Sequence, residues 1–247
     1  MAAYDFTARR LFVASDLADG ALVDLDRQAA NYLLSVLRLP AGAEILVFNG
    51  RDGEWRAALE PTGRKAATLR VVASVRPQTP PSDLHLLFAP LKHARLDYVV
   101  QKAVEMGAGT MVPVLTRRTV ASRVNEERMR ANAIEAAEQC GIITLPAIRP
   151  SLDLSAALAA LEPERLLIFC DEDAQAANPI EALSGARAPA GLALLIGPEG
   201  GFDPEERATI LRRPGTRRLS LGPRILRADT AAVAALAIVQ GVLGDWC

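Results

Sequence analysis

Two loops in the second half of the chain combine residue types that could hold a small ligand. The first loop, residues 197–201, carries three glycines and follows an apolar run at 192–196. Glycine allows the backbone to approach a ligand closely, and a following helix offers unpaired N–H groups at its start. Three residues predict that a helix begins here: Asp203 as N-cap, Pro204 at the first helical position, and Glu206, which completes a capping box.

Glu199 is the residue of this loop that says most about chemistry, because a glycine turn does not itself require a carboxylate. The loop has neither the GxGxxG spacing of dinucleotide-binding folds nor the Gly-Lys-Ser/Thr of a P-loop. Two interpretations are open from the spacing alone. The glycines could serve only a tight strand–helix connection, or they could bring the backbone to a ligand that Glu199 anchors.

The second loop, residues 219–230, carries Arg224 and Arg227 on either side of two apolar residues. The apolar pair predicts that this segment runs partly buried, so that both guanidinium groups face something negative. The alternative is a pair of solvated arginines on an exposed loop. Asp229 or Thr230 is expected to cap the last helix.

Two further arginine pairs, Arg9 with Arg10 and Arg117 with Arg118, are candidates for contact with an RNA backbone. Solvated charged faces are the simpler interpretation of such runs. Of the 28 basic residues all but three are arginine. This usage fits phosphate recognition by a planar fork, but it also fits a genomic bias in codon use. The net charge of −1 argues neither for nor against nucleic acid.

The composition predicts a full hydrophobic core that needs no disulfides. Half of the 247 residues are hydrophobic, which suffices for one large or two ordinary domains. Cys140, Cys170 and Cys247 have no paired spacing, which argues against a disulfide framework or a zinc site and indicates a reducing cytosol. No signal peptide and no apolar run of about 18 residues are visible. We therefore expect a cytoplasmic protein without a metal or a membrane partner.

The periodicity of the chain changes at a proline-rich segment. Residues 1–76 contain short strands, hairpin-type turn pairs and one helix expected over 26–37, a pattern typical of a small β-barrel. Residues 77–83 contain three prolines and indicate a linker. Residues 84–247 alternate strands and helices, which predicts an α/β domain with a largely parallel sheet. The expected strands lie at 84–88, 111–115, 166–170, 192–196 and 218–221, and the expected helices at 96–106, 126–140, 155–161, 205–212 and 230–243.

The two loops also carry a family resemblance. The motifs Leu-Ile-Gly-Pro-Glu-Gly-Gly at 195–201 and Leu-Gly-Pro-Arg-Ile-Leu-Arg at 221–227 resemble those of the RsmE family. These proteins are the 16S ribosomal RNA (uracil-N3)-methyltransferases of the SPOUT superfamily. Segments 32–38, 101–107 and 135–141 are similar to the other signature helices of the family. The chain departs from the family pattern at Asn31, Ile142, Ala228 and Asp229.

The resemblance implies a fold, a cofactor and partners. It implies an N-terminal PUA-like β-barrel that binds RNA and a C-terminal SPOUT-type α/β domain whose end is threaded into a trefoil knot. It also implies S-adenosylmethionine as cofactor, a homodimer, and 16S ribosomal RNA or the 30S subunit as substrate. Two other classes of function stay open: a related knotted methyltransferase acting on a ribose 2′-hydroxyl or a transfer RNA, and a non-catalytic RNA-binding assembly factor.

The implied reaction assigns roles to particular residues. Methylation at uracil N3 requires loss of the N3 proton, so the protein must orient the reactants, stabilise uridinate-like charge and assist proton removal. Arg224 or Arg227 is expected to stabilise that charge, and Glu199 either positions the cofactor or accepts the proton; these three are the predicted catalytic residues. The predicted cofactor-binding residues are Ile196, Gly197, Pro198, Glu199, Gly200, Gly201, Leu219, Leu221, Gly222, Ile225, Leu226 and Thr230. The predicted RNA-binding residues are Arg9, Arg10, Arg117 and Arg118.

Overall fold

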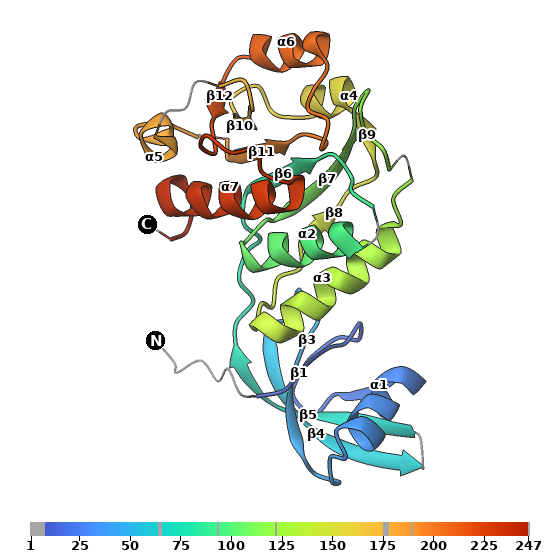
Figure 1. The fold of residues 1–247 in the computed structure, drawn as a ribbon. Coiled ribbons are helices and arrows are strands. Elements are labelled where there is room, and N and C mark those ends of the chain that lie inside the picture. Colours follow the sequence, from blue (N-terminus) through green and yellow to red (C-terminus); the bar gives the residue numbers. More distant parts are fainter. Residues whose placement is uncertain are drawn as a thin grey trace. The chain divides into compact units, whose positions relative to one another are not determined.

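The computed structural model divides the chain into two compact units. The first comprises Met1–Pro80 with Ile134–Leu145, and the second comprises Pro81–Ala133 with Pro146–Cys247. Figure 1 shows the elements of both. The described residues are 8–63, 66–92, 94–121, 123–174, 178–188 and 190–246; Cys247, one of the three cysteines discussed above, lies outside them.

The first unit contains a five-strand sheet within the described residues. The strand order is β1-β3-β4-β5-β2, with β1 and β3 parallel and the other pairs antiparallel. Closure of these strands into a barrel stays a prediction. The strands are β1 (Arg10–Phe12), β2 (Leu22–Asp24), β3 (Glu44–Phe48), β4 (Glu54–Gly63) and β5 (Ala66–Arg76).

The helix expected over 26–37 is present in two parts, α1 (Arg27–Asn31) and a π-helical segment, η1 (Tyr32–Val36). Asp26 begins α1 as N-cap, and its carboxylate accepts the backbone N–H of Ala29 at 2.7 Å. Leu33 is buried with the sheet residues that form the core of this unit. Burial of this apolar stripe against the sheet stabilises so short a helix more than propensity does.

The end of helix α3 (Glu126–Cys140) belongs to the first unit and has a structural contact there. The carboxylate of Glu138 accepts the backbone N–H of Phe12 at 2.8 Å. Burial raises the pKa of Glu138, with the hydrogen bond from Phe12 opposing it. Gly141 ends the helix at a φ of 64°, as the sequence predicted, and its carbonyl accepts from Arg76 at 2.9 Å. The signature segment 135–141 thus secures strand β1 and the end of β5.

The second unit confirms the predicted α/β domain with a parallel sheet. The strand order is β12-β10-β11-β6-β7-β8, all strand pairs among the described residues of this unit are parallel, and β9 also pairs with β7. The strands are β6 (Leu84–Phe88), β7 (Thr110–Leu115), β8 (Ala147–Ile148), β9 (Leu152–Asp153), β10 (Leu166–Cys170), β11 (Leu192–Ile196) and β12 (Thr216–Leu219). The helices besides α3 are α2 (Ala94–Glu105), α4 (Leu154–Ala159), α5 (Pro179–Leu183), α6 (Pro204–Arg212) and α7 (Ala228–Leu243).

Helices cover the sheet of this unit because its central strands are apolar on both faces. Leu87, Phe169 and Leu195 point to one face and form a buried cluster with Leu158 of α4 and Ile210 of α6. On the other side of the sheet, α2 and α7 pack against each other (Figure 1). No helix in the described ranges is long and apolar enough to cross a membrane.

The two helices beside the candidate loops differ in how they begin. Asp203 and Glu206 form the predicted capping box at the start of α6, with Pro204 in the first turn. The predicted cap of α7 by Asp229 or Thr230 was wrong, because Arg227 is the N-cap residue and makes no side-chain cap. The Asp229 carboxylate instead accepts the N–H of its neighbour at 2.8 Å within the first turn.

Candidate functional site

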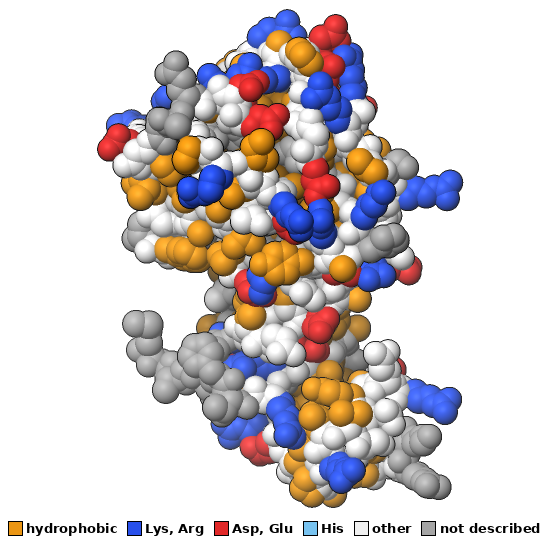
Figure 2. Space-filling view, in the orientation of Figure 1, with side chains coloured by type: hydrophobic (Ala, Val, Ile, Leu, Met, Phe, Trp, Pro, Cys, Tyr) orange, Lys and Arg blue, Asp and Glu red, His pale blue; other side chains and the backbone are white. Residues whose placement is uncertain are grey.

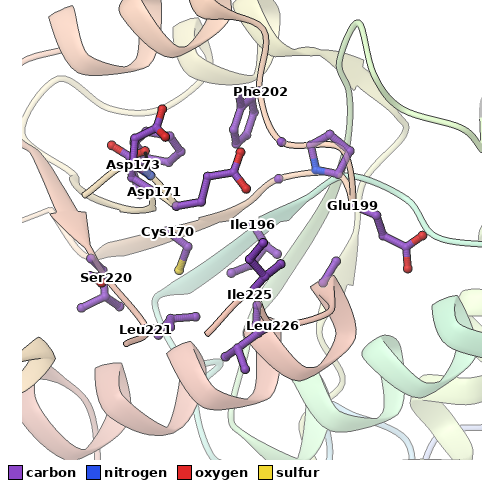
Figure 3. A pocket seen from close by; sticks show the side chains of 18 of the residues that line it. Cys170, Asp171, Asp173, Ile196, Glu199, Phe202, Ser220, Leu221, Ile225 and Leu226 are labelled. Atoms are coloured by element: carbon purple, nitrogen blue, oxygen red, sulfur yellow. Dashed lines mark hydrogen bonds between the residues drawn. The ribbon is translucent and has the colours of Figure 1, made fainter. Parts of the chain in front are cut away.

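Three loops meet at the carboxyl ends of three adjacent parallel strands, β10, β11 and β12. Phe169 of β10 pairs with Leu195 of β11, and Cys170 pairs with Leu219 of β12, so the three strands end at the same edge. In open α/β sheets ligands bind in the crevice outside these carboxyl ends. A cavity of about 190 Å³ lies there (Figure 3).

Both loops singled out in the sequence contribute to this cavity. Arg224, a predicted catalytic residue, lines it, whereas Gly200, Arg227 and Thr230 are not among its lining residues. The other predicted residues that line it are Ile196, Gly197, Pro198, Glu199, Gly201, Leu219, Leu221, Gly222, Ile225 and Leu226.

The third loop, which follows β10, was missed by the sequence analysis. Its residues Asp171, Glu172 and Asp173 line the cavity together with Phe202 and Ser220. An acidic run directly after a buried strand was a visible signal. By itself this run does not point to the site, because the sequence does not say that β10 lies between β11 and β12.

Asp171 is a buried ionic centre in the wall of the cavity. Its carboxylate accepts hydrogen bonds from Arg207 at 3.0 and 2.9 Å and from Arg218 at 2.6 Å. Burial alone would raise the pKa of Asp171, but the two guanidinium groups and the N–H of Asp173 outweigh it and lower that pKa. Because Arg207 belongs to α6, which follows the glycine loop, and Arg218 to β12, which precedes the second loop, one carboxylate links the β10 loop to elements next to the other two loops.

The thiol of Cys170 faces the cavity but is not a nucleophile at neutral pH. Burial, followed by the charge of Asp171, raises its pKa to about 12. The thiolate is the reactive form of cysteine. Chemistry at this site therefore does not depend on covalent attack by Cys170.

Glu199 is placed differently from the other carboxylates. It is about half exposed and forms an ion pair with Arg95 of α2. Figure 3 shows its carboxylate on the side of the pocket opposite Asp171 and Asp173. The side chain thus lies at the rim of the cavity and not deep inside it.

Glu172 is the carboxylate of the cavity without a partner among the described residues. Asp171 and Asp173 are paired with Arg207, and Glu199 with Arg95. The Glu172 carboxylate lies over the backbone of Gly201, where an added Cβ would come within 2.0 Å of its Oε1. Gly201 also has a φ of 68°, a left-handed conformation that favours glycine. The cavity therefore has one carboxylate without an ion-pair partner among the described residues, next to backbone that carries no side chain at Gly201.

The second loop is more exposed than the sequence predicted. Partial burial of the apolar pair was expected. Leu226 is partly buried, as predicted, whereas Ile225 is 94% exposed. The loop leaves β12 through Gly222, at a φ of 99°. Arg224 and Arg227 are exposed as well, and their guanidinium groups have no ion-pair partner among the residues that the structure describes. Two positive charges are thus free beside the cavity.

The four predicted RNA-binding arginines are in different situations. Arg9 is exposed. Arg10 is buried and paired with Glu54 at 2.9 Å, so its side chain does not reach a phosphate and that prediction is corrected. Arg117 pairs with carboxylates at the start of α6, and Arg118 donates to the carbonyl of Gly200. On the face drawn in Figure 2, Lys and Arg side chains lie scattered among acidic and apolar ones.

Comparisons with known proteins match both parts of the chain. The family model for an RNA methyltransferase domain matches residues 78–240, and that for an RNA methyltransferase PUA domain matches 25–72. Ribosomal RNA small subunit methyltransferase E of Rickettsia conorii is 30% identical over 239 residues, covering 96% of this chain and 97% of its own. The chain belongs to the ribosomal RNA small subunit methyltransferase E (RsmE) family.

Two solved structures are similar to this RsmE-family chain over nearly its whole length. The RsmE of Neisseria gonorrhoeae, bound to S-adenosyl methionine, is 27% identical with a TM-score of 0.82 and covers 97% of this chain and 100% of its own. A putative methyltransferase from Legionella pneumophila, also in complex with that cofactor, is 30% identical with a TM-score of 0.80 and covers 95% and 97%. Within the described part of this chain, no group of three or more His, Cys, Asp or Glu side chains is placed to hold a metal ion.

Proposed function

We propose that this chain methylates N3 of a uridine in 16S ribosomal RNA of the small subunit with S-adenosylmethionine as methyl donor. The observation that carries the proposal is the cavity formed by three loops, with its apolar wall, its glycine backbone, and a free carboxylate and guanidinium. Membership of the RsmE family and the cofactor in two similar structures support it.

The lining suits S-adenosylmethionine in each of its parts. Ile196, Leu221 and Leu226 offer apolar surface to an adenine ring, and the backbone of the loops offers N–H and C=O groups to its edge. The free carboxylate of Glu172 suits the ammonium or sulfonium charge, and the free guanidinium of Arg224 suits a carboxylate or a uracil oxygen. When bound, the cofactor supplies an electrophilic methyl group.

The residues of the chain then have three tasks. The backbone around Gly197, Gly201 and Leu219 holds the donor in one orientation, which converts a bimolecular step into a unimolecular one. Arg224, with Arg227 nearby, stabilises the negative charge that develops on the uracil oxygens as N3 loses its proton. Glu199, at the rim, either accepts that proton or fixes the donor.

Replacing Glu199 by Gln separates its two roles. Normal cofactor affinity with lost turnover would favour proton acceptance, and lost affinity would favour positioning. The amide keeps the size and the hydrogen-bonding reach of the side chain but removes the base. Arg95→Gln, which removes the ion-pair partner of Glu199, is a useful companion variant.

We further propose the family features that the resemblance implies. These are a trefoil knot formed by the last part of the domain spanning 84–247, a linker at 77–83, an RNA-binding PUA-like domain at 1–76, a homodimer, and a cytoplasmic location. Arg9 remains the candidate for phosphate contact in the first domain, because it is exposed. The target uridine must leave its stack to reach the cavity.

The decisive experiment incubates the purified protein with labelled S-adenosylmethionine and 30S subunits that lack the modification. Nucleoside analysis should find label in N3-methyluridine. Label in a 2′-O-methylated nucleoside, or transfer only to transfer RNA, would overturn the proposed target. No transfer together with no cofactor binding in calorimetry would instead indicate a non-catalytic assembly factor.

A further inference from the structure

The glycine loop 197–201 is held from outside the cavity by the segment that follows strand β7. The guanidinium of Arg118 donates a hydrogen bond to the carbonyl of Gly200 at 2.8 Å. The stem of the same side chain lies against the loop, since an added Cβ on Gly200 would meet Cδ and Cβ of Arg118 at 3.7 and 3.8 Å. Gly200 does not line the cavity, whereas Pro198, Glu199 and Gly201 do. Arg118 therefore contacts the loop at a residue that does not line the cavity.

The neighbouring residue, Arg117, fastens the same segment to the helix after the glycine loop. Its guanidinium pairs with Asp203 at 2.7 Å and Glu205 at 2.6 Å. Its backbone N–H donates to Glu206 at 2.9 Å, and the other oxygen of Glu206 accepts the N–H of Asp203 in the capping box. The segment after β7 thus holds both the glycine loop and the start of α6.

The β7 segment is itself shaped by a local turn. The hydroxyl of Thr119 accepts the N–H of Thr116 at 2.9 Å, and the Thr119 N–H donates back to the Thr116 carbonyl at 3.1 Å. This turn fixes the backbone from which Arg117 and Arg118 project. Little conformational freedom then remains to be lost when the two arginines make their contacts.

We infer that Arg118 is a positioning residue for the cofactor: it sets the conformation of the glycine loop by holding the Gly200 carbonyl from outside the cavity. The inference rests on the proposed function, because the loop is taken to bind S-adenosylmethionine. It replaces the sequence-based expectation that the 117–118 pair contacts RNA. Both guanidinium groups are already engaged by the chain, and the charge of Arg117 is met by two carboxylates.

The test compares S-adenosylmethionine binding by calorimetry in the full-length protein and three variants. Arg118→Ala should weaken binding about tenfold, because one charge-assisted hydrogen bond that orders the loop is lost. Arg118→Lys should lose less, since an ammonium still reaches a carbonyl as a single donor. Arg123→Ala is the matched control, because Arg123 is an exposed arginine five residues further along the chain that forms no hydrogen bond or ion pair with the loop among the described residues. This variant should bind the cofactor as the unaltered protein does.

A second measurement tests the role of Arg118 in ordering the loop without depending on cofactor binding. Hydrogen exchange of the amides at 199–202, measured without cofactor, should be faster in Arg118→Ala than in Arg123→Ala. The positioning role would be overturned if Arg118→Ala left both the exchange rates and the cofactor affinity unchanged. Weaker RNA binding by that variant, with a shallower dependence of the binding constant on salt, would instead show that Arg118 contacts RNA. If the unaltered protein does not bind the cofactor, the proposed function fails, and the exchange rates alone still decide whether Arg118 orders the loop.

Discussion

The carboxylate of Asp171 accepts two hydrogen bonds from the guanidinium of Arg207, at 3.0 and 2.9 Å. Asp171 follows strand β10 and Arg207 is on helix α6, so the pair joins two of the three loop regions around the cavity. Arg218 of β12 adds a third bond at 2.6 Å. The cavity walls are therefore linked by an ionic centre as well as by the sheet.

We expect Asp171→Asn to lower the free energy of unfolding by about 2 kcal/mol at neutral pH, because two guanidinium groups lose their charged acceptor. Asp173→Asn is the control; its carboxylate is 69% exposed and lies 3.5 Å from Arg207, so the loss should be below about 0.5 kcal/mol. Urea denaturation of both variants checks this. Equal effects of the two substitutions would mean that Asp171 is not the centre of the network.

The pH dependence of this contribution has a definite sign. The pKa of Asp171 in the folded chain is below its ordinary value of 3.8. Its contribution is therefore present above the unfolded pKa and is lost as the pH falls through the lowered folded pKa. The difference in unfolding free energy between the unaltered protein and Asp171→Asn should shrink as the pH is lowered below about 4. A difference that grows on acidification would contradict the assignment.

Two adjacent glycines should differ in how well they tolerate replacement by alanine. Gly201 has a φ of 68°, and an added Cβ would lie 2.0 Å from Glu172 Oε1. Gly201→Ala should cost about 1 kcal/mol or more in stability and weaken cofactor binding by displacing Glu172. At Gly200 the added Cβ meets only Arg118 at ordinary contact distance, so Gly200→Ala should be close to neutral. Thermal unfolding and calorimetry on both variants decide; a Gly200 effect as large as that of Gly201 would be unexpected.

Cys170→Ala should retain turnover within about threefold, although the thiol lines the cavity. With a pKa of about 12, the thiol is protonated throughout the neutral range and supplies no thiolate. Label transfer to RNA, followed under single-turnover conditions, is the measurement. A hundredfold loss with intact cofactor affinity would instead indicate a covalent intermediate.

The sequence predicted the parts of the site that depend on local signals. The capping box of Asp203 and Glu206 lies within one helical turn, and the glycine loop stands directly before it, so both could be found by spacing. The role of Asp171 could not be found by spacing, because its partners Arg207 and Arg218 are distant in sequence and lie next to it only in the folded domain. The exposure of Ile225 was missed for the same reason: apolar character predicts burial only where the fold supplies a surface to cover it.

The central strands of the fold were also predicted from the sequence, whereas its shortest strands were not. Strands β6, β10 and β11 have the predicted bounds, because buried parallel strands are short continuous apolar runs. The two-residue strands β8 and β9 and the short strand β2 were missed, since so few residues carry no period. The assignment of 134–145 to the first unit depends on tertiary contacts of Glu138 and Gly141, which no linear pattern reveals.

Arg224→Ala should reduce methyl transfer about a hundredfold or more while leaving the affinity for S-adenosylmethionine within about threefold. The reason is that a free guanidinium at the cavity acts on charge that develops only in the transition state. Arg224→Lys should recover part of the rate, because it keeps the charge but not the planar fork. Turnover and calorimetry are measured on the same preparations. If the loss of cofactor affinity accounts for the whole loss of rate, Arg224 instead binds the carboxylate of S-adenosylmethionine.

Arg9 and Arg10 are consecutive in sequence but should give different phenotypes, because Arg9 is exposed just before β1 whereas Arg10, the first residue of β1, is buried. Arg9 is exposed, so Arg9→Ala should leave stability within about 0.5 kcal/mol. It should also weaken RNA binding and reduce the slope of log K against log salt by about 1. Arg10→Ala should instead lower stability by about 2 kcal/mol, because the 1%-exposed Glu54 loses one of the two arginine partners that it has among the described residues and keeps Arg76, at 2.8 Å. Filter binding across a salt series and urea denaturation on each variant separate the two roles. If part of the Arg10→Ala protein is unfolded, RNA binding should fall by the same factor at every salt concentration, and the slope of log K against log salt should not change. A reduced slope in Arg10→Ala would mean that the Arg10 side chain contacts a phosphate, which would contradict its burial.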